Sequence, residues 1–182
     1  EASHELPLLL LLVDSRVLVP TLRESTWRLA MRRLGPSTWT LILTPLAVAE
    51  QTVAEAAKFG IDSVAYAADR HHEKTDIVVT NYERFEKFDM RKYAGIVLDE
   101  SGIIKSQDGA TRRILTEACL DTPWKLCCTA TPAPNDYTEL GQHAEFLGVM
   151  TAKEMLSMFF VHDGSIRAND HSQGNDGWRL KR

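Results

Sequence analysis

Two short apolar segments of the sequence each end in residues that can handle phosphate, metal and water. Gly95–Leu98 is followed directly by Asp99 and Glu100, and Trp124–Cys128 is followed by Thr129-Ala130-Thr131-Pro132. A carboxylate at the tip of a buried strand can hold Mg²⁺ against nucleotide phosphates, and the next carboxylate can orient and deprotonate the attacking water. Two hydroxyls at a second strand end can hydrogen-bond both the acidic strand and the ligand. The pattern indicates phosphate chemistry.

Each of these signals also has an ordinary structural explanation. An isolated Asp-Glu pair is more often a helix cap or a solvated loop, and a Thr-Ala-Thr-Pro segment is common where a strand enters a turn. The setting of the acidic pair favours function, because four apolar residues precede it and Ser101 and Lys105 follow it. The two signals gain specificity from their order, since about one helix and one strand separate them.

Two further strand ends carry polar residues in front of a predicted helix. These are Thr44-Pro45-Leu46 and Thr80-Asn81-Tyr82-Glu83. Hydroxyls and backbone amides at helix N-termini contact phosphates well, including those of nucleic acids. Taken alone, each segment would be an ordinary helix cap. Lys105, a cation shortly after the acidic pair in sequence, is a further candidate for a phosphate contact.

The hydrophobic pattern predicts the elements that must position these residues. Short apolar runs predict strands, and apolar residues at helical spacing predict helices between them. This alternation indicates an α/β fold, a mainly parallel sheet with helices on both faces. The carboxyl ends of parallel strands meet at one edge, so we expect Asp99, Thr44, Thr80 and Thr129 to lie there together. The predicted strands span residues 40–43, 61–66, 76–80, 96–98 and 125–128, and the predicted helices span residues 22–34, 47–59, 111–120 and 137–147.

Length and composition limit the classes of protein that fit. The 182 residues suit one domain with a real core, or one domain and a fragment of another. The net charge of −4 gives no overall basic character, so any nucleic-acid contact must come from a local patch or from backbone amides. Three cysteines without metal-ligand spacing favour a reducing, cytoplasmic setting.

The leucine-rich segment of residues 6–13 does not predict a membrane span. A bilayer requires roughly 20 apolar residues, and no basic leader precedes this segment. We expect a core strand or a disordered leader here, and no membrane partner. The first residue is Glu1 rather than Met, which leads us to expect a fragment of a longer protein.

Taken together, the motifs resemble the first RecA-like lobe of a Swi/Snf-type superfamily-two helicase of the DEAD/DEAH-like class. The resemblance is close to the versions found in phages and prophages. It runs from about Thr40 to the C-terminus, and four ordered motifs at plausible spacing make it very specific. The matching segments are residues 43–48, 77–84, 97–106 and 126–135, with further likeness at residues 139–148, 159–164 and 178–181.

The resemblance implies an ATP-driven motor on double-stranded DNA that uses ATP and Mg²⁺. It implies that Asp99 binds Mg²⁺, that Glu100 is the catalytic base, and that Thr129 and Thr131 couple the nucleotide to the DNA. The DNA backbone contacts that it implies are Thr44, Pro45, Thr80 and Asn81, and we add Lys105 to this predicted nucleic-acid site.

The sequence departs from the family at the phosphate loop G-x-x-x-x-G-K-[ST], which should precede the first helix. Residues 1–34 contain no glycine, the first being Gly35. By position, Ser25 and Thr26 fall near the expected Lys-Ser/Thr, which makes Thr26 the candidate nucleotide contact. The preceding Glu24 would repel phosphate, and without glycines the backbone cannot wrap phosphates closely.

We therefore predict three segments with different roles. Residues 1–39 form an aberrant or truncated N-terminal segment without a phosphate loop, residues 40–162 form the ATP-binding RecA-like lobe, and residues 163–182 form a polar tail or linker toward a missing second lobe. That second lobe supplies the family's arginines at the ATP site. The chain alone is accordingly expected to be catalytically inactive.

Two other functions are compatible with the residues. The first is a non-catalytic DNA-binding or scaffolding lobe that kept the fold after losing nucleotide binding, and nucleotide-binding measurements would distinguish it. The second is a metal-dependent nuclease, which would need further carboxylates near Asp99. The other strand ends offer threonine and proline instead.

Overall fold

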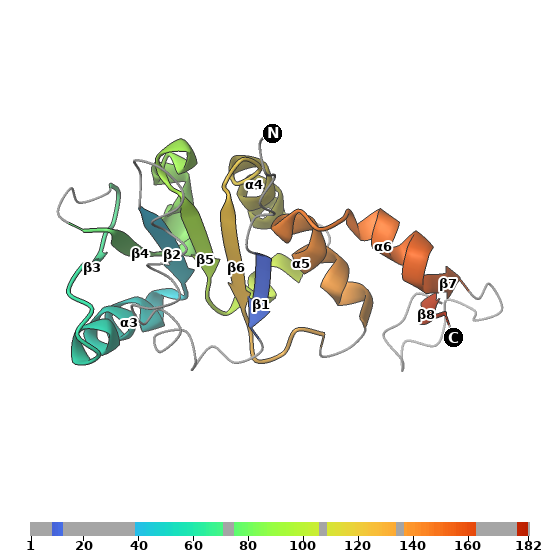
Figure 1. Cartoon of the computed structure of the whole chain (residues 1–182), viewed down its shortest axis with the longest axis horizontal. Coiled ribbons are helices and arrows are strands. Elements are labelled where there is room, and N and C mark those ends of the chain that lie inside the picture. The colour runs from blue at the N-terminus through green and yellow to red at the C-terminus, as the bar shows by residue number, and fades with distance from the viewer. Residues whose placement is uncertain are drawn as a thin grey trace, which may run out of the picture.

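The computed structural model describes residues 9–12, 39–70, 75–105, 109–133, 137–162 and 178–181. The predicted helix over residues 22–34, Thr26 and the loop with His71-His72 lie outside the described residues. Figure 1 shows a sheet flanked by helices, with a helix and a hairpin extending from one end. Within the described residues, no helix combines the length and apolar character needed to cross a membrane.

Six parallel strands form the main sheet in the order β1-β6-β5-β2-β4-β3 (Figure 1). All residues of the three neighbouring strands β5, β2 and β4 are buried, as expected for a parallel sheet covered on both faces. The strands are β1 (Leu9–Leu12), β2 (Thr40–Thr44), β3 (Val64–Tyr66), β4 (Ile77–Asn81), β5 (Gly95–Leu98) and β6 (Trp124–Cys128).

The α-helices and 3-10 helices follow the strands in sequence. The α-helices are α3 (Leu46–Lys58), α4 (Ala110–Ala118), α5 (Leu140–Leu147) and α6 (Ala152–Phe159). The 3-10 helices are η2 (Tyr82–Lys87), η3 (Met90–Lys92), η4 (Ser101–Lys105) and η5 (Tyr137–Glu139). A second, two-stranded antiparallel sheet pairs β7 (Phe160–His162) with β8 (Trp178–Leu180).

Two hydrophobic clusters cover opposite faces of the sheet. Because neighbouring residues of a strand point to opposite faces, Leu41 and Leu43 belong to one cluster and Ile42 to the other. The first face packs against η2, η3, η4, α4 and α5 through residues such as Leu115 and Phe146. The second packs against α3 through alanines such as Ala49. The predicted α/β fold with helices on both faces is confirmed.

The segment of residues 6–13 contributes β1, which pairs with β6, so Leu9–Leu12 forms a strand. Predicted and observed bounds of the other elements agree within one or two residues, with two exceptions. The strand predicted over residues 61–66 is only β3, and the helix predicted over residues 137–147 begins as η5 before α5. Its proposed cap at Asn135 or Asp136 lies outside the described residues.

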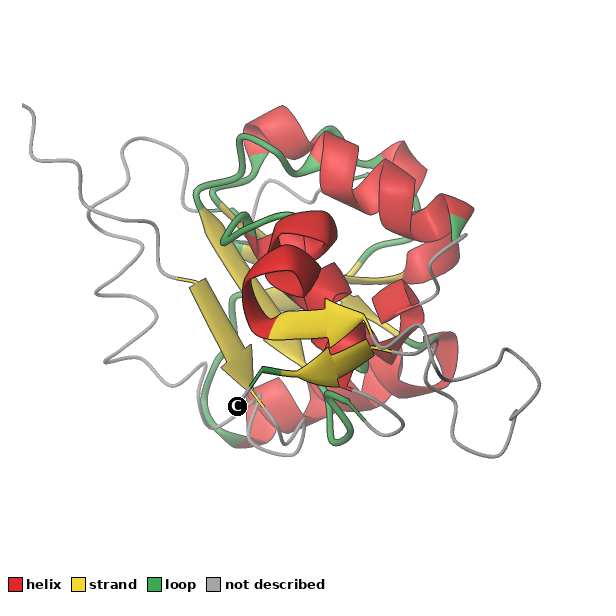
Figure 2. Ribbon diagram, turned by 90° about the vertical axis from the view of Figure 1, so that its right-hand side faces the viewer, coloured by secondary structure: helices red, strands yellow, loops and turns green. Residues whose placement is uncertain are grey.

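The helix α6, the strands β7 and β8 and the 3-10 helices η2, η3 and η4 were not predicted. The helix α6 begins at a capping box, in which the Thr151 side chain accepts a hydrogen bond from the Glu154 backbone and the Glu154 side chain accepts one from the Thr151 backbone. In the segment predicted as a polar tail, Trp178–Leu180 forms a strand, and the ring of Trp178 lies edge-on to His162 with 5.0 Å between centroids. Figure 2 shows α6 and the β7–β8 hairpin facing the viewer at this end of the molecule.

Candidate functional site

The predicted site residues meet at the carboxyl edge of the sheet. Leu43 pairs with both Thr80 and Leu98, and Leu98 pairs with Cys127 on its other side. The next residues along these strands, Thr44, Asn81, Asp99 and Cys128, therefore form one row, and Thr129 lies one position beyond it. Neighbouring strands are about 4.8 Å apart, so four strands bring their polar ends into one compact region, as the sequence predicted.

Asp99 is a buried carboxylic acid with little to balance its charge. The residue is 5% exposed, and its Oδ1 atom has no hydrogen-bond partner among the described residues. Burial and, secondarily, the neighbouring Glu100 charge raise the pKa of Asp99 to about 6, although a hydrogen bond from the Glu100 backbone opposes this rise. Such a carboxylate would gain from a cation placed at the strand tip.

The backbone of Asp99 is held from two sides. Its N–H donates to the Leu43 carbonyl at 2.8 Å, which extends the β2–β5 pairing by one residue. Its carbonyl accepts a hydrogen bond from the Tyr82 hydroxyl at 2.7 Å, and this contact is buried. The position of the acidic residue is therefore fixed by the neighbouring strand β2 and by the first residue of η2, as well as by its own strand.

Glu100 turns the chain sharply away from the sheet. Its φ of 51° lies in the left-handed region, which no other non-glycine residue of the described chain adopts. That conformation costs an ordinary residue about 1–2 kcal/mol relative to the right-handed one. The residue is exposed, in contrast to Asp99. One carboxylate is thus buried at the strand tip, and the other stands in the solvent beside it.

The threonine segment after β6 forms a short turn next to the acidic pair. The Thr129 side chain is buried, and its hydroxyl oxygen accepts a hydrogen bond from the Thr131 N–H at 3.2 Å. Thr131 is exposed. The buried hydroxyl therefore shapes the turn, while the exposed one is available to a ligand.

A lysine and a glutamate connect this turn to the helical side of the site. The ammonium of Lys105 donates to the Thr131 carbonyl, and its Nζ lies 3.9 Å from the Glu139 carboxylate. Lys105 was predicted to contact nucleic acid, and in the structure its ammonium has these two protein partners.

His143 contacts the segment that follows the acidic pair. Its Nε2 lies 3.1 Å from the Ser101 hydroxyl, and both side chains are buried. Burial, together with the nearby Lys105 charge, lowers the pKa of His143 below its usual value, so the ring is neutral at pH 7. Sequence reasoning missed this pair, because no local pattern brings residues 101 and 143 together.

The four predicted DNA-contact residues lie at the ends of β2 and β4. The Thr44 hydroxyl donates to the Pro45 carbonyl at 2.9 Å, whereas the buried Thr80 hydroxyl has no partner among the described residues. Asn81 donates through its amide nitrogen to Glu83, and its buried amide oxygen is also unpartnered within that part of the chain. Unsatisfied buried polar atoms are rare, and they mark this edge as a place where a ligand could bind.

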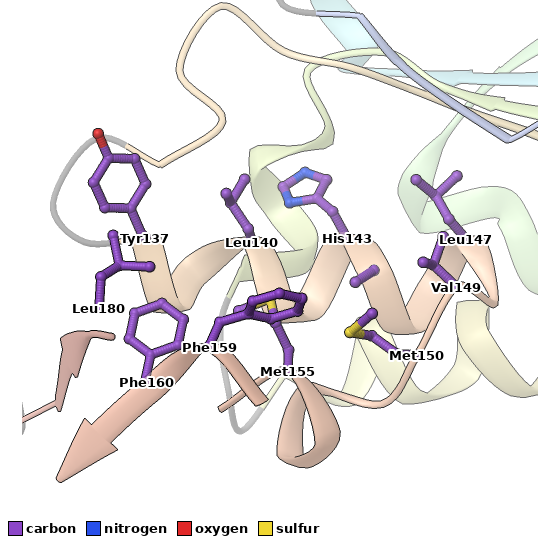
Figure 3. A pocket seen from close by; sticks show the side chains of 11 residues that line it. Tyr137, Leu140, His143, Leu147, Val149, Met150, Met155, Phe159, Phe160 and Leu180 are labelled. Atoms are coloured by element: carbon purple, nitrogen blue, oxygen red, sulfur yellow. The ribbon is translucent and has the colours of Figure 1, made fainter. Parts of the chain in front are cut away.

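An apolar pocket of about 380 Å³ is lined in part by His143 (Figure 3). Its walls come from α5, α6 and the two-stranded sheet. Apart from His143, the lining is almost entirely hydrophobic, which suits neither phosphate nor a metal ion. The lining residues are Tyr137, Leu140, His143, Ala144, Leu147, Val149, Met150, Met155, Phe159, Phe160 and Leu180.

The residues at the carboxyl edge fit a singly anchored magnesium ion better than a protein-made metal cage. Across the described ranges, no group of three or more histidine, cysteine or acidic side chains is placed to hold a metal. Magnesium typically binds through one or two carboxylates together with waters and substrate phosphates. The buried, unpartnered Oδ1 of Asp99 is such a ligand. The nuclease alternative requires additional carboxylates around Asp99. The acidic neighbour of Asp99 is Glu100, the next residue in the chain.

Comparisons with known proteins agree with this geometry. The sequence model of the SNF2-related domain matches residues 20–169. The chain is similar in structure to the Sulfolobus solfataricus SWI2/SNF2 ATPase core in complex with dsDNA, with a TM-score of 0.59 and 22% identity over 83% of this chain and 34% of that one. It is also similar to the Sulfolobus solfataricus SWI2/SNF2 ATPase core domain, with a TM-score of 0.55 and 20% identity over 83% of this chain and 33% of that one.

The comparison with curated proteins finds no match. At this level of identity, the two solved structures establish the fold alone, and the chain spans about a third of their length. The family follows from the sequence model, which covers most of the chain, including every predicted motif. The chain belongs to the SNF2-related domain family and folds as a RecA-like lobe of the Swi/Snf type.

Proposed function

We propose that the chain is a partial ATP-binding lobe of a DNA-dependent ATPase of the translocase type. The observation that carries this proposal is the carboxyl edge itself. A buried carboxylate without a counter-charge stands there beside an exposed carboxylate and a threonine turn, while two further strand ends offer polar groups. Membership of the SNF2-related domain family supports the same function.

Each acidic residue has a distinct role in the proposed reaction. Asp99 would hold the magnesium ion, because it is buried at the strand tip and its Oδ1 is free of other partners within the described chain. When bound with ATP, the ion would neutralise charge on the phosphates. Glu100 is the proposed base, since its exposed carboxylate next to Asp99 can accept a proton from the attacking water. Thr131 would relay the state of this site to bound DNA.

We propose that double-stranded DNA binds along the ends of β2 and β4. The S. solfataricus relative was determined in complex with dsDNA, and the unpartnered Thr80 hydroxyl and Asn81 amide oxygen leave polar groups for a ligand. Thr44 and Pro45 complete this proposed backbone contact. Because these groups are uncharged, binding should depend less steeply on salt than binding through a row of lysines.

A DNA-binding measurement tests this assignment. Fluorescence anisotropy should show that the chain binds a labelled duplex, and Asn81→Ala should weaken binding by roughly 2- to 10-fold, as expected for the loss of one hydrogen-bonding group. Gln51→Ala, an exposed change on α3, serves as the control and should leave the dissociation constant unchanged. Equal affinities for Asn81→Ala and the parent chain would remove Asn81 from the proposed DNA site.

Nucleotide binding by the isolated chain is expected to be weak. The phosphate loop supplies most of the amides that cradle ATP, and residues 1–34 contain no glycine to form one. Thr26 is the remaining candidate contact in that segment. Isothermal titration calorimetry should give a millimolar or weaker dissociation constant for Mg-ATP, with no measurable turnover. A micromolar value would contradict this prediction and require a substitute phosphate-binding segment.

One alternative function has a specific observation in its favour. The glycine-free N-terminal segment, with Glu24 near the expected phosphate position, also fits a DNA-binding or scaffolding lobe that no longer binds nucleotide. Complete absence of Mg-ATP binding together with tight duplex binding would favour this alternative. Turnover gained after restoring a phosphate loop and a second RecA-like lobe would favour the ATPase.

A reducing, cytoplasmic setting remains part of the proposal. Cys119, Cys127 and Cys128 are all buried and free, and none of them forms a disulfide. Burial raises the pKa of Cys119 and of Cys128 to about 12, so both thiols stay protonated and unreactive. These cysteines behave as small core residues. The likeness to phage proteins likewise stays a prediction.

A further inference from the structure

A tyrosine connects the proposed DNA-contact strand to the acidic pair. Tyr82 is the first residue of η2 and directly follows Asn81, the last residue of β4. Its hydroxyl donates to the Asp99 carbonyl at 2.7 Å, and Tyr82 is only 6% exposed. The chain thus provides one buried hydrogen bond between the end of β4 and the tip of β5, across 17 residues of sequence.

The accepting carbonyl belongs to the peptide group that joins Asp99 to Glu100. A peptide group is planar, so fixing the direction of its carbonyl also fixes the direction of its N–H and the plane from which φ of the following residue turns the chain. That residue is Glu100, whose φ of 51° is unfavourable for a side chain with a Cβ atom. Tyr82 therefore helps to hold Glu100 in a conformation that the residue would not adopt by itself.

The hydrogen bond from Tyr82 to Asp99 persists at neutral pH, because the phenol keeps its proton. Burial raises the pKa of Tyr82 well above its usual value, and the nearby cysteines and acidic residues add to this effect, so the phenol remains a donor. Leaving this buried carbonyl without a donor would be unfavourable. The Asp99 peptide is accordingly expected to follow Tyr82 when the end of β4 moves.

We propose that Tyr82 is a positioning residue that transmits DNA contact at Thr80 and Asn81 to the orientation of the Glu100 carboxylate. The inference rests on the proposed function, because it takes the β4 end as a DNA contact and Glu100 as the base. It adds a route between them that passes through the Asp99–Glu100 peptide. The ring of Tyr82 packs in the core, whereas the hydroxyl performs the transmission.

The sequence permits a direct measurement on this peptide group. Asp99-Glu100 is the only Asp-Glu pair in the 182 residues. Chain made by cell-free synthesis with ¹³C-carbonyl aspartate and ¹⁵N-glutamate will therefore give one carbonyl-to-amide NMR correlation, from this peptide alone. Adding duplex DNA should move that signal in the parent chain.

Two matched variants separate the hydroxyl from the ring. Tyr82→Phe keeps the ring in the core but removes the donor, so the DNA-induced movement of the signal should be lost while duplex affinity changes by less than about twofold. Tyr93→Phe also removes a buried hydroxyl from the same hydrophobic cluster, and its signal should move as in the parent chain. Circular dichroism verifies that both variants fold.

The outcomes distinguish the inference from the proposed function. If anisotropy shows no duplex binding by the parent chain, both are wrong. If duplex binds but the Asp99–Glu100 signal stays in place, the inference is wrong and the DNA-binding proposal stands. The inference is equally overturned if the signal of Tyr82→Phe moves as far as that of the parent chain. Should Tyr82→Phe fail to fold, an unmoved signal in the parent chain would still overturn the inference.

Discussion

Glu100→Gln is expected to abolish DNA-stimulated ATP hydrolysis, with a loss of roughly 10²- to 10⁴-fold, which is the usual contribution of a positioned base. The suitable background replaces residues 15–26 by a glycine-rich phosphate loop ending in Lys-Thr and adds a compatible second RecA-like lobe after Arg182. Glutamine keeps the shape of the side chain but cannot accept the proton. Mg-ATP binding should therefore remain close to that of the parent.

The pattern across further variants makes this test specific. Asp99→Asn should weaken the dependence on Mg²⁺, since it removes the charge proposed to face the metal. Thr131→Ala should keep basal hydrolysis but reduce its stimulation by DNA. Glu117→Gln, an exposed change on α4, is the matched control and should leave the rate unchanged. Full stimulated turnover by Glu100→Gln would show that the acidic pair does not serve ATP hydrolysis.

The sequence predicts the framework of the site well because its signals are local. Asp99 and Thr129 each end a buried apolar run, and parallel strands place such ends at one edge regardless of the intervening helices. The register, which pairs Leu98 with Cys127 directly before these strand ends, confirms that reasoning. The roles assigned to these residues, and to Thr26 outside the described residues, remain predictions.

The contacts that tie the site together could not be predicted in the same way. The Tyr82 hydroxyl and the His143 ring reach partners 17 and 42 residues away, and such contacts depend on how helices pack on the sheet. Lys105 has the positive charge expected of a phosphate contact, yet its ammonium donates a hydrogen bond to the Thr131 carbonyl. The capping box at Thr151 was a readable local signal for α6 that the sequence analysis did not use.

The stability of the chain should reveal the charge of Asp99 independently of any activity. The pKa of Asp99 is raised to about 6 in the folded chain, whereas an aspartate in an unfolded chain has a pKa of about 3.9. The folded state therefore holds this proton more tightly, and the favourable contribution is fully present below about pH 4. As pH rises through about 6, that contribution disappears, because the buried carboxylate becomes charged without a partner.

Asp99→Asn should consequently stabilise the chain at neutral pH while removing its proposed metal ligand. The asparagine amide is neutral at every pH, so the variant should gain on the order of 1–3 kcal/mol over the parent at pH 7.5 and almost nothing at pH 4. Urea unfolding followed by circular dichroism at both pH values measures the difference.

Mg²⁺ should stabilise the parent at pH 7.5 more than the variant, because only the parent retains the carboxylate. If the free energies of unfolding of Asp99→Asn and the parent differ equally at pH 4 and pH 7.5, ionisation of Asp99 does not destabilise the folded chain. A residue that costs stability when ionised, at the tip of a buried strand, fits the proposed role of Asp99 as a cation ligand.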